Sequence, residues 1–524
     1  MGQLRIKPIK IFFVFFCLLT IIGIIAYIFP ENGIKLNNNI TLYFPGLEEI
    51  IEQEEAQYKD ITEIVEKNTP NDTLLTFFPD TIAPDIKTLQ NDSSLQHDTD
   101  TGIVKALPKK QTPKTQRQIS DSTRIQYPQG DRSVLHPFFE QLEKIKHNDR
   151  LIRILHYGDS QIEGDRISSY IRNQLQERFG GSGIGLIPVV LPFQTEMPVE
   201  INASKNWKRY TLKNKENFQH NRFGILMSFT RFSPHYSNHH GEVYEASINL
   251  KPSSIAYNKI SQYTRCKIFY GYNRKPFIIQ LEKDDKVVDA EMIPSTSKPE
   301  EFVWSVPPGV NQIKLSFKGE HSPDIYGIAL DGEKGIALDN IPLRGSIGNE
   351  FNKVDTLFYK KMLEKLNTKL ILLQFGTNLV PSSHNDFKFY EDQLYNQLST
   401  LKSLDENLSI IVIGVSDMAE KTGNRYESYP TIEKIRDAQK NAAFRAECAF
   451  WDTFQAMGGK NSMPSWVFAD PPLARKDFTH FTYKGSVVIA KMFYKALMND
   501  FLRYQQRNKQ ENDNIYSDTI STRE

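Results

Sequence analysis

Apolar residues in the second half of the chain follow two alternating patterns. Short, mostly apolar runs are typical of strands that are buried on both faces. Such runs occupy residues 151–155, 369–374, 409–415 and 449–454. Longer stretches with apolar positions at helical spacing follow or separate them, at residues 350–366, 386–404, 431–447 and 483–504. Strands that alternate with helices predict an α/β fold with a doubly wound parallel sheet.

The pattern changes between residues 191 and 325, where many short runs of alternating apolar and polar residues are separated by turn sequences. This spacing predicts a β-sandwich or jelly roll. The module would be inserted into the α/β domain, whose two parts are residues 132–190 and 326–504. It would either present aromatic residues such as Trp207 to sugar rings, or form a scaffold that walls the cleft and keeps them in its core.

The N-terminal residues 1–30 have a different character. Three basic residues precede residues 11–29, an uncharged apolar run that would span roughly 28 Å as a helix. No small-residue cleavage site is evident, which favours an uncleaved anchor over a cleaved signal peptide. The basic start predicts a single-pass protein of the inner (cytoplasmic) membrane, with the rest of the chain on the periplasmic or extracytoplasmic side.

Residues 31–131 are expected to form a stalk. Their polar second half, from about residue 82, is rich in Asp, Ser, Thr, Gln, Lys and Pro, which is typical of a disordered tether. The polar residues 505–524 are expected to form a disordered tail. These two segments would leave the α/β domain and its insertion as the folded part of the chain.

Composition narrows the function classes. The 524 residues include 64 basic and 63 acidic side chains, so nothing in the net charge of +1 suggests a nucleic-acid partner. The three cysteines, Cys17, Cys266 and Cys448, indicate no disulfide framework. No cluster has metal-ligand spacing, and the glycine-rich turn at residues 179–185 lacks the sequence of a phosphate-binding loop. We expect neither a metal nor a cofactor.

Ser160 is the first candidate for chemistry. The run at residues 151–155 ends at Gly158-Asp159-Ser160, and helical spacing begins at Ile167. A serine between a strand and a helix lies at the carboxyl edge of the sheet, where helix-start amides face a ligand. Ser160 could be a nucleophile or only a helix cap. Asp159 is expected to fix the turn.

Downstream segments supply partners for such a serine. The spacing Asp477-x-x-His480 lets a carboxylate bind the Nδ1 hydrogen of a histidine in the same loop, so that Nε2 faces the nucleophile. Gly348 and Asn378 carry a backbone and a side-chain amide of the kind that an oxyanion hole uses. These residues could instead serve only a tight bend and a turn cap.

Taken together and in order, these segments resemble the SGNH (GDSL-type) hydrolase family. Gly158-Asp159-Ser160, Ser346-Ile-Gly348-Asn, Gly376-Thr-Asn378 and Asp477-x-x-His480 match its four blocks. The resemblance implies a serine esterase or acyl-transfer fold. It implies Ser160 as nucleophile, His480 as base oriented by Asp477, and the Ser160 and Gly348 amides with the Asn378 side chain as oxyanion hole. Gln161 replaces the family's leucine, which does not touch the chemistry.

Three functions remain open at this stage. The expected one is a serine esterase that removes O-acetyl groups from an extracytoplasmic polysaccharide or peptidoglycan. An O-acetyltransferase would use the same residues, with a membrane acyltransferase as partner, and a glycan-binding protein would not turn over. Asp417, at the end of a strand, and Trp207 are further candidates for substrate binding. Glu163, Asp165 and Arg166 are expected to be helix-start charges.

Overall fold

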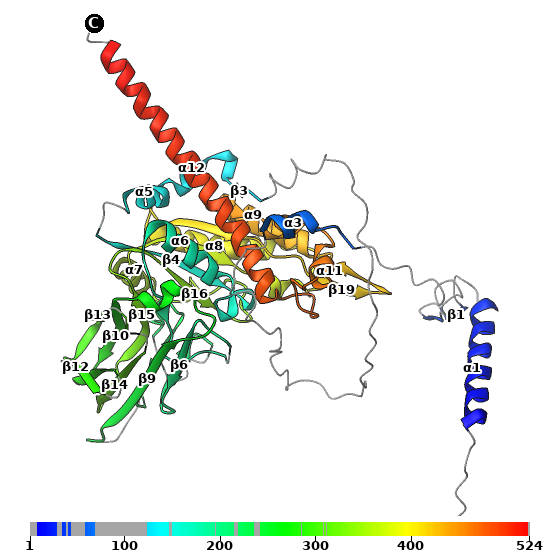
Figure 1. Ribbon diagram of the computed structural model, residues 1–524, viewed down its shortest axis with the longest axis horizontal. Coiled ribbons are helices and arrows are strands. Elements are labelled where there is room, and N and C mark those ends of the chain that lie inside the picture. The colour runs from blue at the N-terminus through cyan, green and yellow to red at the C-terminus, as the bar shows by residue number, and fades with distance from the viewer. Residues whose placement is uncertain are drawn as a thin grey trace, which may run out of the picture. The chain divides into compact units, whose positions relative to one another are not determined.

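The chain forms two compact units, Met1–Gln57 and Tyr58–Glu524 (Figure 1). The computed structural model describes residues 8–28, 34–37, 40–42, 58–68, 123–145 and 149–521, with short gaps at 194, 214–217, 219, 235–240, 284–285, 308 and 311. The first unit contains helix α1 (Pro8–Ile28) and an antiparallel pair, β1 (Ile34–Asn37) and β2 (Ile40–Leu42). None of the helices in the described ranges has the length and apolar character that a membrane span requires. The anchor and the location inferred from it stay predictions.

The second unit is built on a six-stranded mixed sheet. Five strands run parallel, in the order β16 (Gly335–Pro342), β4 (Leu151–Gly158), β17 (Thr368–Gln374), β18 (Ser409–Ile413) and β21 (Ala449–Trp451). An antiparallel edge strand, β3 (Ile125–Gln126), completes the sheet. The α/β class is confirmed, whereas the expectation of an all-parallel sheet is corrected by β3.

Helices cover both faces of this sheet, which explains why its strands are mostly apolar. Ile154 of β4 faces a core shared with one set of helices, and its neighbour Leu155 faces a second core shared with another set. The first set is α5 (His136–Lys144), α6 (Ser168–Phe179) and α12 (Tyr483–Ser521). The second set is α7 (Thr356–Lys365), α8 (Lys388–Leu404) and α9 (Ile432–Arg445).

The segment between α6 and β16 forms two antiparallel sheets whose apolar faces share one core. One sheet contains β5 (Gly185–Ile187), β7 (Lys208–Thr211), β8 (Ser228–Arg231), β10 (Arg265–Asn273), β13 (Thr296–Ser305) and β15 (Asp324–Asp331). The other contains β6 (Val199–Ala203), β9 (Tyr244–Pro252), β11 (Phe277–Lys283), β12 (Lys286–Ile293) and β14 (Ile313–Gly319). We call residues 185–331 the β region. It belongs to the same compact unit as the main sheet.

Two stretches differ from the expected linker and tail. Helix α3 (Thr62–Asn68) lies within the predicted stalk, and the Lys495 Nζ of α12 donates to Asn68 Oδ1 at 2.9 Å. Helix α12 continues to Ser521, through the segment expected to be disordered, and Arg507 pairs there with Glu511 at 2.8 Å. Such i,i+4 pairs stabilise a polar helix that has no apolar periodicity to reveal it.

Short elements connect these parts. They are η2 (Pro128–Gly130), η3 (Arg132–Leu135), η4 (Ser160–Asp165), η5 (Asn258–Gln262), η6 (Thr377–Leu379), β19 (Ala419–Thr422), β20 (Arg425–Ser428), α10 (Thr453–Ala456) and α11 (Ser462–Val467). Both η4 and η6 begin directly beyond the carboxyl ends of neighbouring strands, β4 and β17, which places them at the edge where parallel sheets bind ligands.

His156 makes the stability of this sheet depend on pH. Its ring is fully buried in β4, within 2.7 Å of Ser168 Oγ and 3.1 Å of Gln374 Oε1. Burial lowers the pKa of His156 to about 4, although the contact with Gln374 opposes the shift. Because the unfolded chain binds this proton near pH 6.5, the folded state loses stability as the pH falls through this range.

We therefore expect His156 alone to cost roughly 3 kcal/mol of unfolding free energy between about pH 7 and about pH 4. Urea unfolding at both pH values measures it. His156→Gln should show a correspondingly smaller loss, whereas His384→Gln, which removes an exposed histidine, should behave as the wild type. Equal losses in the wild type and in His156→Gln would contradict the expectation.

Candidate active site

Ser160 lies in the turn beyond β4. The chain first enters η4 and reaches α6 only at Ser168, so the predicted turn continues into a 3₁₀ helix that the sequence pattern did not indicate. The buried Asp159 carboxylate accepts the Gln161 N–H at 3.0 Å and the Thr377 Oγ1 hydrogen at 2.6 Å. Asp159 thus fixes the turn, as expected, and connects it to the loop beyond β17.

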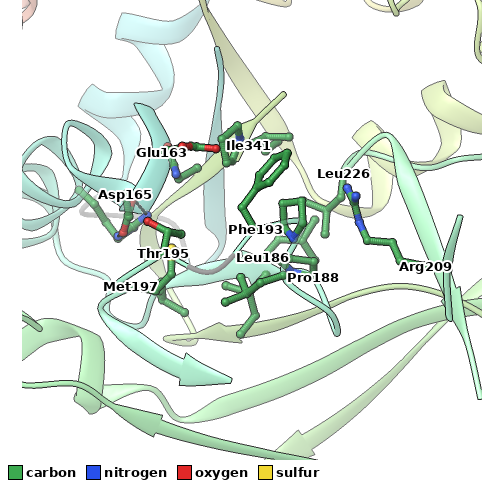
Figure 2. A pocket seen from close by; sticks show the side chains of 17 residues that line it. Glu163, Asp165, Leu186, Pro188, Phe193, Thr195, Met197, Arg209, Leu226 and Ile341 are labelled. Atoms are coloured by element: carbon green, nitrogen blue, oxygen red, sulfur yellow. Dashed lines mark hydrogen bonds and ion pairs between the residues drawn. The ribbon is translucent and has the colours of Figure 1, made fainter. Parts of the chain in front are cut away.

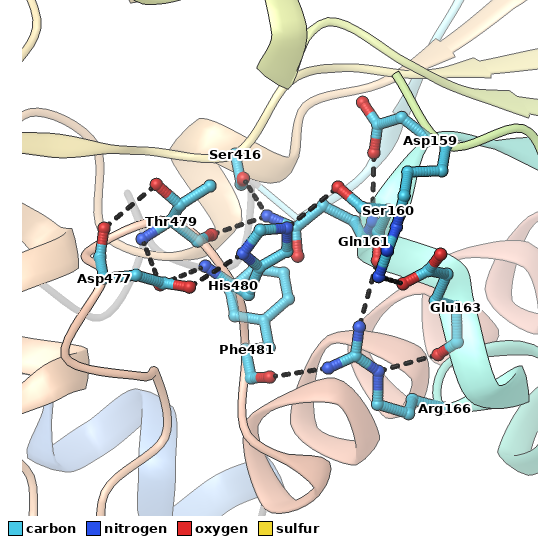
Figure 3. Close-up of polar contacts among 11 residues, drawn as sticks. Asp159, Ser160, Gln161, Glu163, Arg166, Ser416, Asp477, Thr479, His480 and Phe481 are labelled. Carbon is cyan, nitrogen blue, oxygen red and sulfur yellow. Dashed lines mark hydrogen bonds and ion pairs between the residues drawn. The ribbon is translucent and has the colours of Figure 1, made fainter. Parts of the chain in front are cut away.

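His480 connects Ser160 to Asp477 (Figure 3). Ser160 Oγ lies 2.8 Å from His480 Nε2, and His480 Nδ1 lies 2.8 Å from Asp477 Oδ2. Asp477 Oδ1 accepts the backbone N–H groups of Thr479 and His480 at 3.0 Å and 2.9 Å. Partial burial raises the pKa of Asp477, but these hydrogen bonds outweigh it and hold that pKa below its ordinary value. The ionised carboxylate keeps a hydrogen on Nδ1, which leaves the Nε2 lone pair facing Ser160.

The other predicted segments reach the same edge of the sheet because their strands are neighbours. Gly158, the last residue of β4, pairs with Pro342 of β16 and with Gln374 of β17. A Cβ at Gly158 would lie only 2.7 Å from the Gln374 carbonyl oxygen, so this close approach requires glycine. The loops that contain Gly348 and Asn378 therefore flank the Ser160 turn.

The two predicted oxyanion donors differ in what they already bind. The Gly348 N–H is donated to Ser346 Oγ at 2.9 Å. The contact is local, because the Ser346 hydroxyl accepts from the amide two residues later. The oxyanion role of Gly348 stays a prediction. Asn378 Nδ2 donates one hydrogen to the Ser346 carbonyl oxygen at 2.9 Å, and its amide carries a second. Asn378 is exposed, whereas Ser160 is half-buried.

Gln161 ties the Ser160 turn to the histidine loop. Its Nε2 donates to the Thr479 carbonyl oxygen at 2.6 Å and to Ser416 Oγ at 3.2 Å (Figure 3). Sequence reasoning gave Gln161 no role and considered Asp417, not Ser416, at this strand end. A motif could not reveal this contact, because a side-chain bond to a backbone carbonyl leaves no constraint on residue type at the accepting position.

Arg166 makes a second connection between the same loops. Its guanidinium donates to three backbone carbonyls, those of Ser160 (3.0 Å), Glu163 (2.7 Å) and Phe481 (3.2 Å) (Figure 3). Burial lowers the pKa of Arg166 to about 10, so the side chain stays charged at neutral pH. Arg166 is therefore not a helix-start charge, as the sequence suggested, but a clamp between the segments that carry Ser160 and His480.

Replacing Arg166 by Met should lower kcat roughly 10- to 100-fold with little change in KM, because small displacements of reacting groups cost about this much. Steady-state kinetics with an acyl ester measure both constants, and thermal unfolding monitors the fold. Arg178→Met, on α6, removes an arginine that stacks on Phe179 and should leave kcat unchanged. An unchanged kcat in Arg166→Met would contradict the role of the clamp.

Two predicted substrate-binding residues do not reach the site. Trp207 is 7% exposed, lies in the core of the β region, and donates its indole N–H to the Ser247 carbonyl oxygen at 3.2 Å. Its ring faces are covered, so it offers no platform to a sugar. Asp417 is fully buried, where it accepts hydrogen bonds from Ser428 Oγ at 2.6 Å and the Met463 N–H at 2.7 Å. Both residues stabilise packing.

A pocket lies beside η4, between the main sheet and the β region (Figure 2). Glu163 and Asp165 of η4 form one end, and Arg209 of β7 forms another. Mostly apolar side chains separate the two ends, among them Leu186 and Phe193. Within the described ranges, no three His, Cys, Asp or Glu side chains gather as a metal site would require.

Comparisons with known proteins identify the fold. No family model and no curated protein matches the chain. A solved peptidoglycan O-acetylesterase is 21% identical over 70% of this chain and 96% of its own, with a TM-score of 0.55. A salicylyl-acyltransferase from a tetracycline biosynthetic pathway (12% identity, 48% and 82% of the two chains) and a family two carbohydrate esterase from Clostridium thermocellum (9% identity, 49% and 92%) reach TM-scores of only 0.25 and 0.24. The chain therefore shares the overall fold of the peptidoglycan O-acetylesterase.

Proposed function

We propose that this protein is a serine esterase that removes O-acetyl groups from a polysaccharide or from peptidoglycan. One observation carries the proposal, namely the continuous hydrogen-bonded row from Ser160 Oγ through His480 to Asp477, with 2.8 Å at each step. A hydroxyl, an imidazole and a carboxylate in this order form the arrangement that activates a serine for acyl transfer.

The reaction proceeds in two halves. Ser160 Oγ attacks the acyl carbonyl carbon while His480 Nε2 takes the hydroxyl proton, and Asp477 stabilises the imidazolium that forms. The tetrahedral intermediate collapses to an acyl-serine, and His480 returns the proton to the leaving sugar oxygen. Water then attacks the acyl-serine with His480 again as base, which releases acetate and restores the Ser160 hydroxyl.

The negative oxygen of the tetrahedral intermediate needs donors beside Ser160. Asn378 is suited because its amide keeps a second hydrogen beyond the one given to Ser346. Gly348 would contribute only if its N–H left the Ser346 hydroxyl. We therefore infer that Asn378 and the Ser160 amide supply most of the stabilisation, and that Gly348 joins when substrate displaces the Ser346 contact.

The fold supports the choice of an O-acetyl ester. The chain is similar over 70% of its length to a protein described as a peptidoglycan O-acetylesterase, and the match covers 96% of that protein. The four sequence blocks agree with an SGNH-type hydrolase. We infer that the β region is a module inserted between the first βα unit and β16, since β4 and β16 are adjacent in the sheet although about 180 residues lie between them. The basic and apolar N-terminus supports a substrate outside the cytoplasm.

Acetate release tests the proposal. The purified full-length chain should release free acetate from O-acetylated peptidoglycan or acetylated xylan, and from 4-nitrophenyl acetate. Transfer of the acetyl group to an added sugar hydroxyl, without free acetate, would replace the esterase by an O-acetyltransferase. Binding of the polymers without turnover of any ester would leave a glycan-binding protein and overturn the proposal.

A further inference from the structure

The pocket beside η4 is small and has mixed walls. Its volume is about 40 Å³, which is room for roughly three water-sized groups. Leu186, Pro188 and Phe193 form apolar walls, and Glu163 lies three residues beyond Ser160 along the chain (Figure 2). The pocket thus lies next to the turn that carries the proposed nucleophile, on the side of the β region.

The positive and negative charges of the side chains that line the pocket do not balance. Asp165 and Arg172 pair with each other, at 2.6 Å and 3.0 Å, and both are fully buried. Glu163 pairs with Arg344 at 2.6 Å. Among the residues that the structure describes, Arg209 alone of the charged side chains lining the pocket forms no ion pair. The lining therefore has one positive charge without a counter-ion.

Arg209 enters the pocket from β7 of the β region (Figure 2). Its Nε atom is buried and has no hydrogen-bond partner within the described ranges. Burial lowers the pKa of its guanidinium to about 10, so Arg209 is still protonated at neutral pH. The residue as a whole is half-buried, but a buried Nε without a hydrogen bond costs free energy, which a ligand that accepts hydrogen bonds from the guanidinium would recover.

Resting on the proposed function, we propose that Arg209 binds a carboxylate carried by the acylated substrate, which makes this an esterase for acidic glycans. A carboxylate has three heavy atoms, matching the size of the pocket, and a guanidinium binds it through two parallel hydrogen bonds. Glu163 Oε1, buried and without a partner in the described structure, would accept a hydroxyl hydrogen from the same substrate unit.

The experiment compares two forms of one polymer, O-acetylated peptidoglycan and the same material with its carboxylates converted to amides. For the wild type, amidation should raise KM roughly 10- to 100-fold, the usual worth of a charge-assisted hydrogen bond. For Arg209→Gln, KM should be equal on both forms. Lys208→Gln removes the neighbouring positive charge, outside the pocket, and should discriminate as the wild type does.

Two further measurements distinguish failure of the carboxylate site from failure of the proposed esterase. Turnover of 4-nitrophenyl acetate by the wild type, with equal KM on both polymer forms, would overturn the carboxylate site and leave the esterase intact. If no ester is hydrolysed, co-sedimentation of Ser160→Ala with each polymer still tests the carboxylate site. Stronger binding to the native polymer than to the amidated one, lost when Arg209→Gln is added, would support the site. Arg209→Gln should unfold at the wild-type temperature or above. A lower temperature would mean that Arg209 has a structural partner, and would contradict the proposal.

Discussion

Replacing Ser160 by Ala should reduce acyl-ester hydrolysis by roughly 10⁴-fold or more, the usual effect of removing a serine nucleophile. The reason is geometric, because Ser160 Oγ is the group that His480 Nε2 contacts at 2.8 Å. The rate of 4-nitrophenolate release from 4-nitrophenyl acetate measures the effect. Thermal unfolding should be nearly unchanged, since the Ser160 side chain makes no other hydrogen bond in the described structure.

Ser416→Ala is the matched control. Ser416 also lies at the site, where its hydroxyl accepts a hydrogen from Gln161 at 3.2 Å, but within the described residues it makes no hydrogen bond to His480. Its loss should lower the rate by less than about 10-fold, the effect of a single peripheral hydrogen bond. Equal losses in the two variants would mean that the site responds to any serine removed, and that Ser160 has no distinct role.

Replacing Arg153 by Met should lower the free energy of unfolding by about 3–5 kcal/mol, the usual result of removing one partner from a buried ion pair. Arg153 of β4 pairs with Asp331 and Asp339, and all three side chains are fully buried. Asp339 also accepts the Leu186 N–H at 2.8 Å. The cluster therefore holds the β region against the main sheet, and its loss leaves two buried carboxylates without a counter-ion.

Urea unfolding at about pH 7 measures this loss, and a lower pH should reduce it. Burial already raises the pKa of Asp339 to about 6, against the opposing effect of Arg153. Without Arg153 that pKa rises further, so acid protonates the folded state and restores stability. Arg265→Met breaks the exposed pair with Glu333 and should cost less than about 1 kcal/mol. If Arg153→Met lowered the free energy of unfolding no more than Arg265→Met does, the structural role of the cluster would be contradicted.

The main sheet could be predicted because strands that are buried on both faces consist mostly of apolar residues. Most residues of β4 are apolar, apart from Arg153 and His156, and the structure divides the apolar ones between two cores. β3 could not be predicted, because a strand of two residues is too short to show a period. It is ordered by its contact with a distant element, β21.

The candidate active site could also be predicted from the sequence only in part. Asp477 and His480 are three residues apart, so their contact follows from local spacing. Their loop lies between α11 and α12, and the contacts of Gln161 and Arg166 with its backbone hold it beside Ser160. The contacts of Gln161 with backbone groups had no such signal. Trp207 was ambiguous for another reason, because an aromatic residue in a strand has the same sequence pattern whether it faces the core or solvent. Only the packing places it in the core.

The most direct test of the central claim is to trap the acyl group on Ser160. The full-length chain would be mixed with 4-nitrophenyl acetate, quenched in acid, digested with trypsin and analysed by mass spectrometry. Cleavage after Arg153 and Arg166 yields a peptide in which Ser160 is the only serine. We predict an acetyl group on Ser160 that accumulates and then decays as acetate is released. A chain that hydrolyses the ester without acetylating Ser160, or that is acetylated elsewhere, would contradict the account.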